Sequence, residues 1–247
     1  MNTPERDIKG VKTLLESGGL AIGALVVGAS LLTVTIGALE GVGIGIRNHP
    51  ARQLLLSTVL LQGVAFGGVA LGYLWLTGRG FEMLRVRVPT LRDIGWIVGG
   101  FIVLGGLLVG ISQLLGLLGI ELAQNDVVST ASQEPIAFLL LVPLSILLVG
   151  PGEELLYRGV IQGSLAESFH VGRAIILASA LFAAIHVFSL LGSGAGVAAY
   201  IGFVFVLATV LGATYVLSDN LLVPAAIHGL YNAAQFGLAY VQAVGLL

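Results

Sequence analysis

The chain has 247 residues, of which 57% are hydrophobic and 10% are charged, and its formal net charge is -2. Soluble domains usually carry about 25% charged residues, so this composition excludes an ordinary soluble domain and indicates a membrane protein. The small net charge gives no sign of a nucleic-acid partner. The sequence contains no cysteine, which excludes disulfide bonds and thiolate metal ligands.

Apolar segments long enough to cross a bilayer recur along the chain, since a spanning helix needs about 20 mostly apolar residues. Seven segments meet this condition: Leu20–Ile46, Leu54–Thr77, Ile94–Leu118, Pro135–Tyr157, Ala174–Leu190, Val197–Leu217 and Leu221–Val244. The first is too long for the apolar core of a signal peptide. The sequence therefore predicts an all-α, polytopic transmembrane helix bundle of about seven spans, with eight as the alternative.

The predicted spans divide the chain into three parts. We expect residues 1–17 to form a short cytoplasmic segment, residues 18–134 to form three transmembrane helices with an external loop, and residues 135–247 to form a transmembrane core that carries the motifs described below. Nine Lys and Arg residues, Arg6 among them, lie on the same side of the predicted bundle as the N-terminus, and two lie on the other. The positive-inside rule then places the N-terminus in the cytoplasm, and we expect the plasma membrane.

Polar groups interrupt three of the apolar segments, where ionisable side chains are costly and therefore indicate function. They are Glu153, Glu154 and Arg158, then His186, which follows Phe182 by four residues, then His228 and Asn232. Because residues four apart share a helix face, we expect Glu154 to pair with Arg158. Adjacent helical residues point about 100° apart, which leaves Glu153 free to face a cavity.

The residues Glu153, His186, His228 and Asn232 can converge from three helices and support hydrolysis. A desolvated carboxylate can serve as a general base. Two histidines and an amide can orient the attacking water, stabilise an oxyanion or bind a metal. Residue types alone do not choose among these roles. They leave open whether the site works without a cofactor or holds zinc on Glu153, His186 and His228.

The motifs E-E-x-x-x-R, F-x-x-x-H and H-x-x-x-N follow one another over residues 153–232. This order resembles the CPBP family, the CAAX proteases and bacteriocin-processing enzymes also called the Abi family. The resemblance implies that Glu153 activates water, and that His186, His228 and Asn232 hold that water or a metal and stabilise the tetrahedral intermediate. It further implies that Glu154 and Arg158 form a supporting ion pair and that Phe182 packs beside the site. Family members have been described both as zinc enzymes and as glutamate-dependent proteases without a catalytic metal.

We therefore expect an intramembrane endopeptidase that acts on membrane-associated proteins or peptides, with prenylated CAAX proteins as one class. A proton-coupled transporter and a catalytically silent membrane scaffold are the alternatives. No inverted repeat supports a transporter, and the intact motif residues do not favour a scaffold. Read singly, Glu154 and Arg158 could be a structural ion pair, and either histidine could be an ordinary core residue.

Overall fold

The computed structural model describes residues 3–247, with side chains from residue 8 onward. Residues 1–2 and the side chain of Arg6, both within the predicted cytoplasmic segment 1–17, lie outside the described residues. The elements are α1 (Thr3–Gly41), α2 (Pro50–Thr58), η1 (Val59–Phe66), α3 (Gly67–Thr77), η2 (Phe81–Leu84), α4 (Leu91–Leu117), β1 (Gln124–Asn125), α5 (Asp126–Ser132), α6 (Ile136–Leu144), η3 (Ser145–Val149), α7 (Gly150–Glu154), η4 (Leu155–Gln162), α8 (Gly163–Ala166), α9 (Val171–Ile185), η5 (His186–Ser189), β2 (Leu190–Leu191), α10 (Ala195–Ser218) and α11 (Leu222–Ala243). The segments η1, η3 and η4 are π-helical, and η2 and η5 are 3₁₀ helices.

Six helices in the described part of the chain are long and apolar enough to cross a membrane. They are Ile8–Gly41, Pro50–Thr77, Leu91–Leu117, Ile136–Ala166, Val171–Ser189 and Ala195–Ser218. They correspond to the first six predicted segments, so the predicted all-α transmembrane bundle is confirmed. The protein is therefore an integral, multi-pass membrane protein.

The seventh predicted segment, Leu221–Val244, forms α11 but is not among the six apolar helices. The helix is long enough to cross a membrane and contains no Asp, Glu, Lys or Arg, so the difference from the other six is its lower mean hydropathy. Polar residues such as His228 and Asn232 lower that hydropathy. The structure nevertheless packs α11 against α4, α6, η3 and α7. This helix is thus part of the bundle interior.

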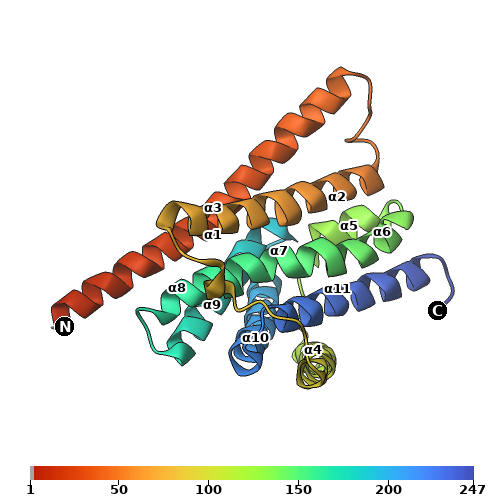
Figure 1. Cartoon of the computed structure of the whole chain (residues 1–247). Coiled ribbons are helices and arrows are strands. Elements are labelled where there is room, and N and C mark those ends of the chain that lie inside the picture. The colour runs from red at the N-terminus through yellow and green to blue at the C-terminus, as the bar shows by residue number, and fades with distance from the viewer. Residues whose placement is uncertain (1–2) are drawn as a thin grey trace.

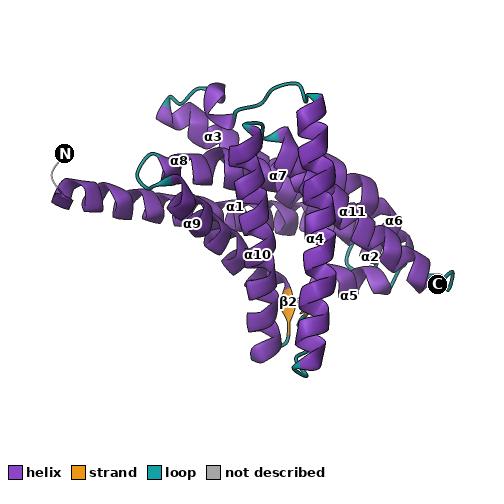
Figure 2. Cartoon of the chain, turned by 90° about the horizontal axis from the view of Figure 1, so that it is seen from below, coloured by secondary structure: helices purple, strands orange, loops and turns teal. Residues whose placement is uncertain are grey.

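The helices of the bundle run in two main directions. Figure 1 shows α1 lying across the pair α2 and α3, and α1 packs on the π-helical segment η1 between them. Figure 2 shows α4 and α10 side by side, running across the direction of α1. The short strands β1 and β2 pair antiparallel, with Asn125 opposite Leu190, and Figure 2 shows β2 between the lower parts of α4 and α10. The main buried cluster joins η4, α9, α10 and α11.

The fourth span, Ile136–Ala166, is one continuous helix whose winding changes along its length. Its π-helical segments η3 and η4 lie on either side of α7, which ends with Glu153 and Glu154. π-Helical turns are rare and are frequently found at functional sites. The change of winding sets the directions in which the two carboxylates leave the helix.

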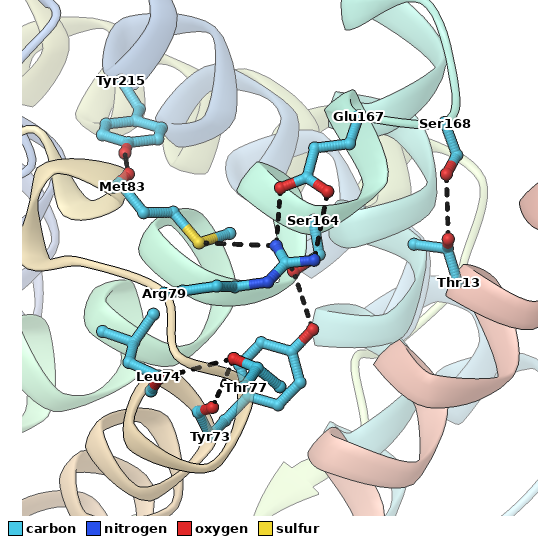
Figure 3. Close-up of polar contacts among 10 residues, drawn as sticks. All are labelled: Thr13, Tyr73, Leu74, Thr77, Arg79, Met83, Ser164, Glu167, Ser168 and Tyr215. Atoms are coloured by element: carbon cyan, nitrogen blue, oxygen red, sulfur yellow. Dashed lines mark hydrogen bonds and ion pairs between the residues drawn. The ribbon is translucent and has the colours of Figure 1, made fainter.

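Polar contacts fix the end of this span to its neighbours, as Figure 3 shows. Arg79, just after α3, donates to both carboxylate oxygens of Glu167 at 2.6 and 3.1 Å and to Ser164 at 3.3 Å. The hydroxyls of Thr13 on α1 and Ser168 are 2.9 Å apart. These contacts join α1, α3 and α8 at the end of the bundle that the sequence predicts to be cytoplasmic.

Candidate active site

Close backbone contacts bring the fourth span against α11. A Cβ on Gly150 would lie 2.8 Å from the backbone nitrogen of Gly229, and a Cβ on Gly229 would lie 2.8 Å from the Ser145 carbonyl oxygen. Real Cβ atoms do not approach that closely, so both positions require glycine, as in other tightly packed membrane helices. This approach places Glu154 of one helix beside His228 of the other.

A buried chain of hydrogen bonds joins Arg158, Glu154 and His228. The Arg158 Nε donates to Glu154 Oε2 at 2.8 Å, and both side chains are fully buried. The other oxygen, Glu154 Oε1, lies 2.9 Å from His228 Nδ1. A carboxylate facing an arginine accepts hydrogen bonds, so Nδ1 is the donor. Glu154 therefore fixes the orientation of the His228 ring. The spacing of the motifs does not predict this contact.

Glu153 lies on the other side of the His228 ring. Its Oε2 is 3.8 Å from His228 Nε2, and Glu153 is 7% exposed. That distance is longer than a direct hydrogen bond. The two adjacent glutamates thus contact the two nitrogens of the same imidazole in different ways. Glu154 is hydrogen-bonded to His228, and Glu153 keeps its carboxylate free for another group.

Phe182 connects His186 to this arrangement. The Phe182 ring lies 4.7 Å from the ring of His186 and 5.9 Å from the ring of His228, and the guanidinium carbon of Arg158 is 5.3 Å from its centroid. The His186 Nδ1 is 2.8 Å from the Phe182 carbonyl oxygen. A carbonyl oxygen can only accept, so Nδ1 carries the proton and a neutral ring leaves Nε2 as an acceptor.

The structure brings most of the predicted site residues into one cluster. Direct contacts join Glu153, Glu154, Arg158, Phe182, His186 and His228. Asn232 lies one helical turn after His228 and is half-buried, and its side chain makes no hydrogen bond with the other described residues. Its predicted position on the same face of α11 follows from their spacing.

The predicted zinc ligands do not form a metal site in the described part of the chain. Within it, no group of three or more His, Cys, Asp or Glu residues is arranged to hold a metal ion. Catalytic zinc usually has three protein ligands. The Nδ1 atoms of His228 and His186 are hydrogen-bonded to Glu154 and to a backbone carbonyl, which leaves the Nε2 atom of each ring open, as in histidines that ligate zinc. The described geometry does not gather Glu153, His186 and His228 around one point, and no step below is assigned to zinc.

The site also contains residues that the motifs do not single out. Tyr157 is fully buried, and its ring meets those of Phe182 and Phe66 edge to face at 4.9 and 6.3 Å. On sequence alone, Tyr157 could be an aromatic residue at the membrane interface; the structure shows that it belongs to the core. The position of Tyr157 between Glu154 and Arg158 in the sequence does not predict its burial, because that burial depends on the contact with Phe182 of α9.

Comparison with protein families identifies the segment that carries this site. Residues 135–234 match the family described as Type II CAAX prenyl endopeptidase Rce1-like. Over these residues the chain is similar to this family of CAAX-type endopeptidases. The matched segment includes every predicted site residue, from Glu153 to Asn232. Searches among curated proteins and among solved structures gave no match. This similarity supports, at the family level, a membrane protease of the CAAX type with a membrane-associated protein as substrate.

Proposed function

We propose that the protein is an intramembrane endopeptidase that hydrolyses peptide bonds with water activated by Glu153. One observation carries the proposal: Glu153 and Glu154 occupy opposite sides of the His228 ring, and only Glu154 is hydrogen-bonded to it. The carboxylate of Glu153 is therefore available as a general base beside a histidine of fixed orientation. A positioned base of this kind typically contributes about 10²–10⁴-fold to rate.

The reaction would begin with a water molecule that contacts Glu153. Its proton moves to the Glu153 carboxylate as its oxygen attacks the scissile carbonyl carbon. The His186 Nε2, an acceptor in the neutral ring, accepts the second hydrogen of that water and orients it. Hydrolysis by these steps uses only groups of the chain itself.

The tetrahedral intermediate carries a negative oxygen that needs hydrogen-bond donors. The Asn232 amide supplies N–H groups on the same face of α11 as His228. When His228 is protonated on both nitrogens, its Nε2–H is a second donor, while Nδ1–H stays on Glu154. The C–N bond then breaks, and the proton held by Glu153 passes to the leaving amine.

The substrate in this proposal is a protein or peptide held at the membrane, and a prenylated CAAX protein is the first class to test. The charge distribution of the loops predicts that the end of the fourth span that follows Glu153 and Glu154 lies on the cytoplasmic side. A lipidated C-terminus lying along that membrane surface could enter the catalytic core, residues 135–247, from that side. We also propose a plasma-membrane location with a cytoplasmic N-terminus.

The test is cleavage of a farnesylated CAAX reporter peptide by the purified full-length protein in liposomes. Wild type, Glu153→Gln and Glu16→Gln are compared, each with and without a chelator. Glu16 is a matched control because it is a half-exposed carboxylate on α1, far along the chain from the motifs. We expect loss of cleavage in Glu153→Gln alone. Full activity of Glu153→Gln would refute the role of Glu153 as the base.

Two further outcomes of this assay have separate meanings. Loss of wild-type cleavage on chelation would show that a metal is needed and would replace the mechanism given above. Cleavage of unprenylated membrane peptides, with none of the farnesylated reporter, would keep the endopeptidase and remove the CAAX substrate.

A further inference from the structure

The guanidinium of Arg158 is only partly paired, although Arg158 is fully buried. Its Nε donates to Glu154, whereas Nη1 and Nη2 make no hydrogen bond with any residue from 8 to 247. Native interiors pair nearly all buried polar groups, either with other protein groups or with ordered water. The two Nη atoms therefore call for an acceptor on the side of Arg158 that faces away from Glu154.

A buried acceptor without a donor lies next to these atoms. Gln162, one turn further along η4, donates from Nε2 to the Gly212 carbonyl oxygen at 3.1 Å, but its Oε1 has no donor among the described residues. A Cβ on Gly212 would lie 2.7 Å from Gln162 Oε1 and 3.6 Å from Arg158 Nη1. The unpaired donor Arg158 Nη1 and the unpaired acceptor Gln162 Oε1 thus both lie near the position that a Cβ on Gly212 would occupy, and they are not bonded to each other.

Helix α9 contributes further residues near this position, beside those of η4 and α10. Ile175 Cγ2 lies 3.1 Å from the same point beside Gly212. Ser179, one turn later on the same face of α9, is fully buried, and its hydroxyl has no partner within residues 8–247. Phe182, another turn along, packs against the guanidinium of Arg158. Groups from three helices therefore meet beside Gly212, and several of them are polar groups without a partner among the described residues.

We propose that Arg158, Gln162 and Gly212 enclose a buried hydration site in which an ordered water molecule bridges the guanidinium and the glutamine. The water oxygen accepts a hydrogen bond from an Nη–H of Arg158, and one water hydrogen is donated to Gln162 Oε1. A buried water usually has two to four such partners, and Ser179 is available for another. A side chain at position 212 would reach into this polar junction, since its Cβ would lie 2.7 Å from Gln162 Oε1.

The bridging water gives Gln162 a positioning role. Arg158 is held by Glu154 at Nε and by the water at Nη, and Glu154 in turn orients His228. The site lies on the α10 side of Arg158, away from Glu153, and its existence does not depend on the proposed protease activity. Its effect on cleavage would act through the orientation of His228.

The test compares three variants of the full-length protein in detergent by their thermal unfolding midpoints: Gly212→Ala, Gly212→Ser and Gly202→Ala. Gly202 is the matched control, because it lies in the same helix and an added Cβ there meets nothing within 4 Å. Alanine favours a helix over glycine, so Gly202→Ala should keep or raise the Tm. Gly212→Ala displaces the water, and its Tm should fall below that of Gly202→Ala by roughly 3 °C or more.

Gly212→Ser separates hydration from crowding. The serine hydroxyl can take the place of the water by accepting from Arg158 and donating to Gln162, so the larger residue should recover at least half of the lost Tm. A Tm for Gly212→Ser at or below that of Gly212→Ala would overturn the proposal, as would equal Tm values for the two alanine variants. Peptide cleavage by the same proteins should follow the same order, and a failure of the proposed function would leave the Tm comparison valid.

Discussion

Replacing each of the two adjacent glutamates by glutamine should have very different consequences for stability. Glu154→Gln removes the only charged partner of the fully buried Arg158 among the described residues and weakens the hold on His228. An uncompensated buried charge costs about 3–5 kcal/mol. For a chain of this size, that cost corresponds to a loss of roughly 10 °C in Tm. Glu153→Gln removes a carboxylate that makes no hydrogen bond with another described side chain, and its Tm should stay within about 2 °C of wild type.

The assay is thermal unfolding of both variants in the same detergent, together with cleavage of the reporter peptide. Both variants should lose cleavage, Glu153→Gln because it lacks the base and Glu154→Gln because His228 is no longer oriented. Activity alone cannot distinguish the two roles, whereas the Tm can. Equal stability of the two variants would refute the assignment of Glu154 as the partner of Arg158 and His228.

Three other changes test the remaining parts of the structure. Asn232→Ala should lower turnover by about 10²–10³-fold at unchanged Tm if its amide stabilises the oxyanion; normal turnover would remove it from the site. Gly229→Ala should cost about 1–3 kcal/mol of unfolding free energy through overpacking against the Ser145 carbonyl, whereas Gly237→Ala on the same helix, with open space at its Cβ, should cost nothing measurable by denaturant titration. Arg79→Gln should lower the Tm only slightly, since partly exposed ion pairs contribute about 0–1 kcal/mol, and a large drop would contradict that estimate.

Local spacing was enough to predict part of the site. Glu154 and Arg158 are four residues apart on one helix, and the structure contains their ion pair. Apolar length likewise predicted the six spanning helices. The contact between Glu154 and His228 joins residues 74 positions apart, and it depends on the close approach at Gly150 and Gly229. In a chain with 36 glycines, no sequence pattern marks these two as the ones that need contact.

The ends of the helices were also only partly predictable from the sequence. The sequence places the start of the first span at Leu20, but α1 runs without interruption from Thr3 to Gly41. Composition reports where a helix can lie in lipid and does not report where its hydrogen bonding begins. The division of the chain at residues 17 and 134, and the role of Asn232, stay predictions.

The pairing of Glu154 with Arg158 also bears on how the chain enters the membrane during synthesis. A charged side chain near the middle of a spanning helix adds about 2.5–3.5 kcal/mol to the cost of insertion. Glu154 and Arg158 belong to the same helix, so they can neutralise each other as soon as that helix forms. Glu153 has no such neighbour until α11 is made. The nascent fourth span therefore carries one unneutralised carboxylate, and the translocation machinery must tolerate that carboxylate until the last helix arrives.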